Sequence, residues 1–117
     1  MRIFIIMNKP IKVRDIINTA NAISHSFGLK VYQEVLPVLK NGNDVVISFE
    51  GIRNLSSGFC NASIGKLFLD FPDQSKKQLE IEGIENSRWK RKVEDAIELA
   101  TNKTKRELHE EAIADLF

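Results

Sequence analysis

The sequence predicts a single α/β domain, in which helices pack on a mixed sheet of about four strands. Its 117 residues suffice for one hydrophobic core and are too few for two ordinary domains. Short apolar runs rich in β-branched residues alternate along the chain with longer segments whose apolar residues recur at helical spacing. This alternation is typical of a sheet covered by helices, with right-handed crossovers between parallel strands. We therefore treat residues 1–117 as one domain, with residues 101–117 as a candidate C-terminal helical extension.

The N-terminal quarter of the chain predicts a strand, an ambiguous segment and a loop. Residues 3–7 form an apolar run without helical spacing, which predicts a strand. Residues 11–17 fit either a second strand that pairs with it or a short helix that begins at Val13. Residues 18–26 are small and polar, which favours a loop. Ser26 at their end is a candidate N-cap, because its hydroxyl can accept from free backbone N–H groups of a following helix.

The helix predicted after Ser26 has a wide apolar face, formed by two adjacent rows of side chains at helical spacing. These side chains are Phe27, Leu29, Val31, Tyr32, Val35, Leu36, Val38 and Leu39. Pro37 lies within this pattern. Because proline lacks an N–H and clashes with the preceding turn, we expect it to kink the helix or to end its regular part near Leu36. The sequence Asn41-Gly42-Asn43 then predicts a turn.

The centre of the chain predicts a buried strand, a tight turn and a second helix. Residues 45–49 are a short apolar run between turn signals, which indicates a strand. Ser56 or Ser57 is the expected N-cap of the helix, and Pro72 should end it near Phe71. Gly65 would permit a close approach between helix and sheet. The apolar stripe that should face the sheet contains Cys60, Ile64, Leu67 or Phe68, and Phe71.

The last third of the chain predicts a connection, a strand and a long helix. Residues 72–78 are polar and read as a connection, whereas residues 79–82 alternate strictly and predict a strand with one wet face that ends near Gly83. Asn86 or Ser87 can cap the long helix. Its apolar row consists of Trp89, Val93, Ile97 and Ala100.

The segment from Thr101 onward leaves several arrangements open. It can pack on the domain, extend freely, or form a homodimer through a C-terminal helix. Thr104 and Glu107 have the spacing of a capping box, so a separate helix could begin there. The apolar side of such a helix would carry Leu108, Ala112 and Leu116.

Composition excludes several classes of protein. Lys and Arg number 17 and Asp and Glu 16, so the net charge of +1 gives no general attraction to nucleic acid or anionic membranes. No apolar run approaches the ~20 residues that span a bilayer, and the N-terminal run is too short for a signal peptide. The single cysteine, Cys60, cannot form an intrachain disulfide. We expect a cytoplasmic protein in a reducing compartment.

Residues 11–71 resemble the STAS-like domain family of unknown function found in bacterial proteins. In that family a strand ending in Phe-Glu-Gly leads through a short loop to a serine-rich start of a helix, which then carries Asn-Ala and Gly-Lys-Leu. The matching residues here are Phe49-Glu50-Gly51, Ser56-Ser57, Phe59, Asn61-Ala62 and Gly65-Lys66-Leu67. The resemblance implies a STAS-like fold and a non-enzymatic protein without a cofactor.

This family is in turn distantly similar to anti-sigma-factor antagonists. Those small domains bind an anti-sigma serine kinase and are switched off when it phosphorylates a serine at the start of a helix. The resemblance implies that Ser56 occupies the phosphorylated position, with Ser57 beside it, although Leu55 stands where the antagonists carry an acid. It also implies an anti-sigma-type serine kinase as the partner. The implied docking surface consists of Gly51, Ile52, Arg53, Asn54, Leu55, Ser56, Ser57, Gly58 and Asn61.

The same strand-to-helix corner also allows other interpretations. The two serines can simply cap a helix, or the corner can belong to a small nucleotide-binding or enzymatic domain. A serine nucleophile with His25 as its base is disfavoured, because Asn54 occupies the position of the first glycine in a nucleophile elbow. Cys60 is expected to be a buried thiol that acts as a small hydrophobic residue.

Metal and nucleic-acid sites have little support in the sequence. His109, Glu110 and Glu111 are adjacent, so on a helix they point in different directions rather than converging on a metal ion. Residues 88–92 are basic around Trp89, but acidic residues follow at spacings that favour ion pairs within the helix. We therefore predict no metal ion and no nucleic acid among the ligands.

Overall fold

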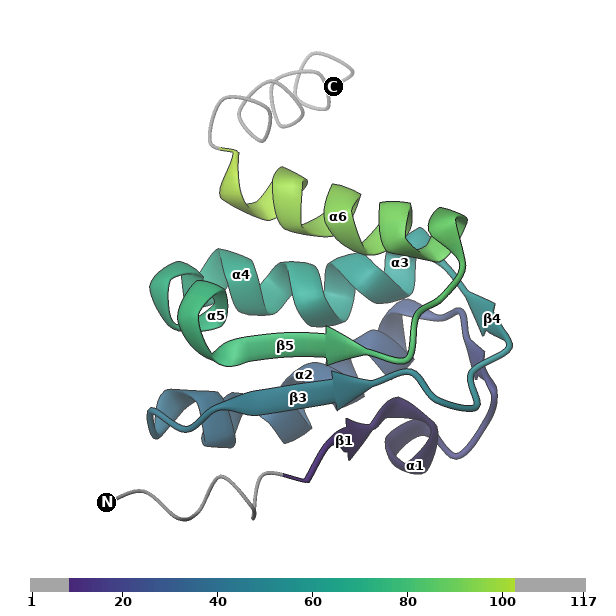
Figure 1. The fold of residues 1–117 in the computed structure, drawn as a ribbon, viewed down its shortest axis with the longest axis horizontal. Coiled ribbons are helices and arrows are strands. Elements are labelled where there is room, and N and C mark those ends of the chain that lie inside the picture. The colour runs from purple at the N-terminus through teal and green to yellow at the C-terminus, as the bar shows by residue number, and fades with distance from the viewer. Residues whose placement is uncertain (1–8, 103–117) are drawn as a thin grey trace.

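A small parallel sheet lies against a layer of helices in the computed structural model, which describes residues 9–102 (Figure 1). The sheet contains β1 (Ile11–Lys12), β3 (Val45–Ser48) and β5 (Leu79–Glu82), in the order β1-β3-β5. Two shorter strands, β2 (Asn21–Ala22) and β4 (Asn54–Leu55), form a separate parallel pair beside it.

The helices are unequal in length. Their bounds are α1 Val13–Ile17, α2 His25–Lys40, α3 Ser57–Cys60, η2 Asn61–Gly65, α4 Lys66–Asp70, α5 Pro72–Gln78 and α6 Ser87–Thr101. The backbone stays in the right-handed helical region across both junctions of η2, so α3, η2 and α4 form one continuous helix with a π-helical turn in its middle. This central helix lies between α2 and α6.

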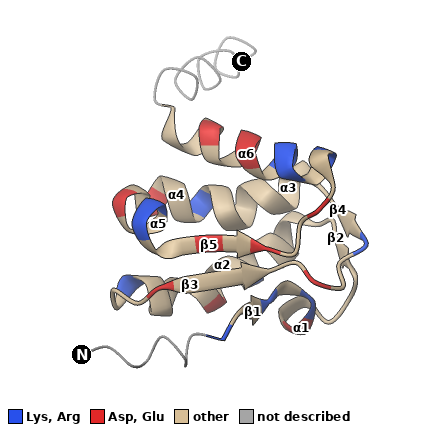
Figure 2. Cartoon of the chain, viewed as in Figure 1, with Lys and Arg blue, Asp and Glu red and all other residues tan. Residues whose placement is uncertain are grey.

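The hydrophobic core lies between the sheet and the central helix. Ile47 of β3, Phe59 of α3 and Ile64 of η2 are fully buried, and the rings of Phe49 and Phe59 meet edge to face at 6.2 Å between centroids. Cys60 and Leu67 are also fully buried, which confirms the predicted apolar stripe of the central helix. Acidic and basic residues are interspersed along the surrounding helices and strands (Figure 2).

The predicted α/β class is confirmed, but the sheet differs from the expected mixed sheet of four strands. Every strand pair among residues 9–102 is parallel, and the strands divide into a set of three and a set of two. The strand predicted at residues 3–7 lies outside the described residues. The ambiguous segment at residues 11–17 combines both alternatives, since β1 continues directly into a helix that begins at Val13.

The start of α2 differs from the prediction, and one of the two alternatives predicted for Pro37 is excluded. Its N-cap is Ser24, whose hydroxyl accepts from the Phe27 N–H at 3.1 Å, and not Ser26. The helix does not end near Leu36 but continues through Pro37 to Lys40. Proline has no N–H, so one backbone carbonyl in the preceding turn lacks its helical hydrogen bond. Because Pro37 lies on the exposed side of the helix, water can bond to that carbonyl instead.

Two predictions about the central and following segments are also corrected. Residues predicted as a polar connection form α5, because Pro72 ends α4 and is itself suited to the first turn of a new helix. Gly65 permits close packing against α6 rather than the sheet, since a Cβ at this position would lie 3.3 Å from the Ala96 carbonyl oxygen. The predicted strand at residues 79–82 and the Asn86 cap of α6 are confirmed.

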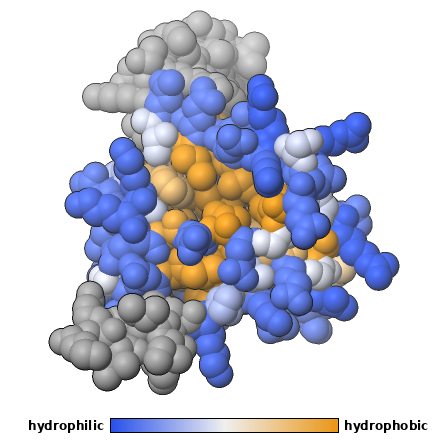
Figure 3. All heavy atoms as spheres, in the orientation of Figure 1, coloured by the Kyte–Doolittle hydropathy of each residue, from blue (hydrophilic) through white to orange (hydrophobic). Residues whose placement is uncertain are grey.

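One surface of the domain exposes its apolar interior. In Figure 3 an apolar area faces the viewer in the region between β5 and α6, with polar side chains around it. Ile81 and Ile84, next to α6, are only half-buried there. Among residues 9–102, no helix has the length and apolarity to cross a membrane.

Candidate functional site

The candidate site is the corner where β4 is followed by the central helix. Ser56 is the N-cap of this helix, and its hydroxyl accepts from the Phe59 N–H at 3.1 Å. The same hydroxyl donates to the Ile23 carbonyl at 3.0 Å, and the Ser56 N–H donates to the Ala22 carbonyl at 3.0 Å. Ser56 therefore joins the start of the central helix to the β2 segment, and its half-buried hydroxyl already has two partners.

Ser57 has a different environment. It is exposed as the first residue of α3, next to the exposed Gly58. Asn61, one turn later, is exposed on the same side. The predicted N-cap is thus confirmed at Ser56, while the more accessible hydroxyl belongs to Ser57.

Basic side chains from α6 lie beside this helix start. The Lys92 ammonium donates to the Leu55 carbonyl at 3.1 Å, one residue before the N-cap. A pocket of about 470 Å³ lies between the central helix and α6, and Arg91, which lines it, forms a 3.5 Å ion pair with Asp95. The residues that line the pocket are Ser57, Asn61, Arg91, Lys92, Asp95, Ala96 and Leu99.

The arrangement suits a negatively charged group. The first N–H groups of a helix have no partners within it, and the helix dipole places partial positive charge at the same end. Lys92 adds a positive charge, Arg91 adds a second that its ion pair with Asp95 partly neutralises, and Figure 2 shows basic residues on the part of α6 nearest α3. Sequence reasoning missed both of them as site residues, because only the tertiary structure brings α6 to this corner. The sole signal was the basic run at residues 88–92.

The predicted docking loop divides into exposed and buried residues. Arg53 and Asn54 are exposed, and the Asn54 side-chain amide donates to the Asn21 side-chain oxygen at 2.6 Å. Ile52 and Leu55 are only 8% and 6% exposed, so their side chains belong to the core and hold the loop in place.

Gly51 gives this loop its turn. Its φ of +82° lies in the left-handed region that favours glycine. The Arg14 side chain packs so close that a Cβ at Gly51 would lie 3.0 Å from a guanidinium nitrogen. The exposed part of the predicted surface therefore consists of Gly51, Arg53, Asn54, Ser57, Gly58 and Asn61.

The contacts among residues 9–102 do not support a serine nucleophile, a metal site or a reactive cysteine. His25 is an exposed residue at the start of α2, and no hydrogen bond to either serine is recorded for it among residues 9–102. No group of metal-binding side chains occurs within that range either. His109, predicted from the sequence not to bind a metal ion, lies outside the described residues. Cys60 is fully buried, and burial raises the pKa of its thiol to about 12 despite the opposing charge of Lys92.

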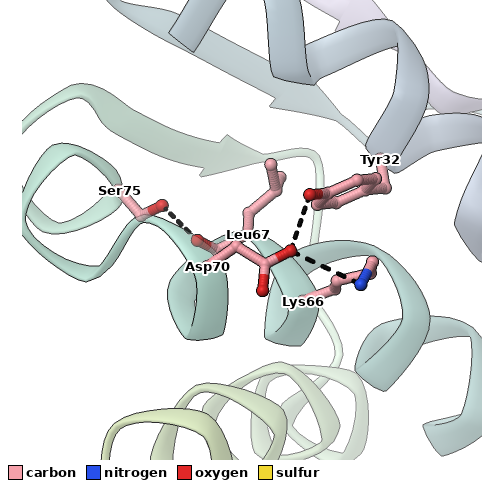
Figure 4. Close-up of polar contacts among 5 residues, drawn as sticks. All are labelled: Tyr32, Lys66, Leu67, Asp70 and Ser75. Atoms are coloured by element: carbon pink, nitrogen blue, oxygen red, sulfur yellow. Dashed lines mark hydrogen bonds and ion pairs between the residues drawn. The ribbon is translucent and has the colours of Figure 1, made fainter. Parts of the chain in front are cut away.

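A second polar cluster connects α2 to the end of the central helix (Figure 4). The Tyr32 hydroxyl donates to the Asp70 carboxylate at 2.6 Å, and Lys66 lies 3.4 Å from the same oxygen. Burial, followed by the hydrogen bond and charge of Asp70, raises the pKa of Tyr32 to about 12. Ser75 of α5 donates to the Leu67 carbonyl at 2.9 Å. These contacts fix three helices relative to one another, so we assign them to the fold rather than to a site.

Comparison with known proteins gives one family and no individual relative. Neither curated proteins nor solved structures yield a match. The family model of a STAS-like domain of unknown function matches residues 28–89, which include most of α2, the corner at Ser56 and the start of α6. The match spans more than half of the chain and confirms the resemblance read from the sequence. The chain belongs to the family of STAS-like domains of unknown function.

Proposed function

We propose that the protein is a non-enzymatic regulatory module that binds a protein partner through the corner between β4 and the central helix. A STAS-like domain is consistent with a regulatory module. The docking surface is the exposed part of the loop at residues 51–55 together with the first turn of the helix. The observation that carries the proposal is the exposed Ser57-Gly58 pair at a helix N-terminus beside Arg91 and Lys92.

Phosphorylation of this corner is the regulatory part of the proposal. The resemblance to anti-sigma-factor antagonists points to Ser56, but its hydroxyl has two hydrogen-bond partners, whereas Ser57 is exposed. We therefore place the phosphate on Ser57. It would carry roughly −1.5 to −2 charges, which the helix N-terminus and the two basic side chains of α6 would stabilise. The same charge would repel a partner whose surface fits a neutral hydroxyl.

The partner proposed on the basis of the resemblance is an anti-sigma-type serine kinase. The test is a pull-down from lysate of the native host with wild type, Ser57→Ala and Ser57→Glu, with captured proteins identified by mass spectrometry. A serine kinase retained by the first two and lost with Ser57→Glu supports both docking and the switch. The same kinase retained by all three removes the switch and leaves the docking module.

Ser87→Glu is the matched control for this experiment. Ser87 is also the exposed first residue of a helix, α6, but it lies outside the proposed surface. Loss of the kinase with Ser87→Glu as well would show that added charge alone disrupts binding, and would contradict the proposed surface. Capture of no kinase by any variant would contradict the proposed partner.

The pocket of about 470 Å³ beside Ser57 favours one second candidate, a nucleotide-binding domain that uses the same corner. Its basic residues suit phosphate groups. Thermal denaturation with ATP or GTP tests it. A rise in melting temperature that Lys92→Met abolishes would favour nucleotide binding, and an unchanged melting temperature would eliminate it.

A further inference from the structure

The strand β5 is an edge strand with a free side. In the order β1-β3-β5 it pairs only with β3 among residues 9–102. The Phe49 N–H donates to the Glu82 carbonyl at 3.0 Å, so Glu82 directs its backbone groups toward β3. Because successive residues of a strand direct these groups to opposite edges, the N–H and C=O of Ile81 point away from β3.

An apolar groove runs beside this free edge. It has a volume of about 300 Å³, and it is lined by Ile81, Ile84, Lys90, Val93 and Glu94. Ile81 is paired with the fully buried Ile47 of β3, so both side chains lie on the face of the sheet that meets the helices. The groove therefore opens onto the core at the edge of the sheet, where Figure 3 shows the apolar area between β5 and α6.

The opposite face of β5 is acidic. Glu80 and Glu82 alternate with Leu79 and Ile81, and both are exposed. Figure 2 shows acidic residues along β5. A strand added next to β5 would lie about 4.8 Å from it and would present alternate side chains to the groove and to these two carboxylates.

We propose that the free edge of β5 binds an extended protein segment in which apolar and basic residues alternate. The backbone of the segment hydrogen-bonds to Ile81, its apolar side chains fill the groove, and its Lys or Arg side chains lie opposite Glu80 and Glu82. This interaction goes beyond the proposed function. It uses β5 and the outer part of α6, and it does not require the loop at residues 51–55 or Ser57.

The negative charge of Glu80 and Glu82 favours a basic segment over a second copy of this chain as the binding partner of β5. Antiparallel pairing of β5 with β5 would place the glutamates of one copy near those of the other, and like charges opposite each other in a sheet are destabilising. Glutamates on an edge strand also oppose its indiscriminate pairing with other chains. A basic alternating segment reverses that repulsion.

The test uses the full chain and a fluorescein-labelled peptide of sequence Lys-Val-Lys-Val-Lys-Val-Lys, with binding followed by fluorescence anisotropy. We expect saturable binding in which the Ile81 amide becomes protected from hydrogen exchange, as measured by NMR. A peptide of sequence Glu-Val-Glu-Val-Glu-Val-Glu should not bind. A Lys-Val peptide with alternate backbone nitrogens methylated keeps its charge but loses one hydrogen-bonding edge, and it should also fail to bind.

Charge-reversal variants locate the binding site. The variant Glu80→Lys/Glu82→Lys should weaken binding by roughly tenfold or more, because two attractive cross-strand pairs become repulsive. The matched control Asp15→Lys/Glu34→Lys makes the same change in net charge at exposed positions on α1 and α2 and should bind as the wild type does. Circular dichroism checks that both variants are folded.

Three results would overturn the proposal. Equal binding of the methylated peptide would show electrostatic attraction without strand addition. Equal weakening by both charge-reversal variants would place the peptide elsewhere. No binding, or an Ile81 amide that is already protected in the free protein, would mean that the edge is unsuitable or is occupied by another part of the chain or a second copy. Loss of binding to a kinase partner with Ser57→Glu but not with Glu80→Lys/Glu82→Lys would separate the two surfaces.

Discussion

At the scale of single residues, the two adjacent serines of the corner have separate roles. Ser56 uses its hydroxyl for a helix cap and for a bond to the β2 segment, and Ser57 presents its hydroxyl to the surface. Adjacent residues at a helix start point in different directions, so one can stabilise the helix while the other remains free for modification. The proposed modification of Ser57 would therefore leave the helix cap at Ser56 in place.

Substitution of these serines should therefore affect stability unequally. Ser56→Ala removes the cap and should lower the free energy of unfolding by about 1–2 kcal/mol. Ser57→Ala removes an exposed hydroxyl and should change it by less than about 0.5 kcal/mol. Urea denaturation monitored by circular dichroism measures both. Equal losses in the two variants would contradict the assignment of Ser56 as the cap.

The thiol of Cys60 should be unreactive in the folded protein. Its pKa of about 12 means that the thiolate, the reactive form, is scarce at neutral pH, and burial blocks access as well. We expect no reaction with a chromogenic disulfide reagent at pH 8 until urea unfolds the chain. Rapid reaction of the native protein would contradict the assignment of Cys60 as an inert buried thiol.

The raised pKa of Cys60 also has a consequence for stability. The thiol ionises near its ordinary value of 9 in the unfolded chain but near 12 in the folded one. As the pH rises, the thiol therefore loses its proton in the unfolded state first. The contribution of the neutral Cys60 thiol to the stability of the folded state is complete below pH 9 and is lost as the pH rises toward 12. Tyr32 acts in the same direction from its ordinary value of 10.

At the scale of elements, glycines set how closely the central helix packs on its neighbours. A Cβ on Gly28 of α2 would lie 2.6 Å from the Phe59 carbonyl oxygen and 2.7 Å from the Ala62 Cβ. The two helices can approach so closely only because the position has no side chain. The sequence alone singled out Gly65 and missed Gly28, since helical spacing does not reveal which residue lies at a crossing point.

Two helical glycines should therefore respond oppositely to alanine. Gly28→Ala should destabilise the protein by about 1–3 kcal/mol, because the added methyl group overpacks the interface of α2 with η2. Gly58→Ala, at an exposed position whose Cβ would meet only the Ser56 hydroxyl at 3.9 Å, should stabilise it by about 0.5–1 kcal/mol. Thermal denaturation compares the two. Stabilisation by both would contradict the close packing at Gly28.

At the scale of the whole molecule, the layer order decides which surfaces remain for partners. The central helix packs against α2 and α6, and at its N-terminal end its first turn and the adjoining loop are exposed. On another side lies the edge of β5, which pairs with no strand other than β3 within residues 9–102 (Figure 1). The two proposed interaction surfaces are thus built from different elements.

The oligomeric state remains a prediction from the sequence, since Leu108, Ala112 and Leu116 lie outside the described residues. If the C-terminal segment forms a homodimer, the full chain should elute from gel filtration as a dimer, and Leu108→Asp/Leu116→Asp should elute as a monomer. Light scattering coupled to the column gives the mass directly. A monomeric wild type at high concentration would contradict a homodimer.

The sequence by itself determined most of the local structure. Short-range patterns located β3, β5, the capped starts of the central helix and α6, and the turn at Asn41-Gly42-Asn43, because each depends on neighbouring residues. Local patterns failed where two candidates were close together, as with Ser24 and Ser26, or where solvent tolerated a local defect, as at Pro37.

Only the tertiary structure decided the pairings between distant segments. It brings Lys92 of α6 to the carbonyl of Leu55, places Gly28 against the central helix and, within the described part of the chain, leaves the outer edge of β5 without a paired strand. The order β1-β3-β5 and its parallel pairing likewise depend on contacts between segments that are far apart in the sequence. Such contacts depend on how the apolar faces of separate elements pack together, and no local spacing in the chain encodes that arrangement.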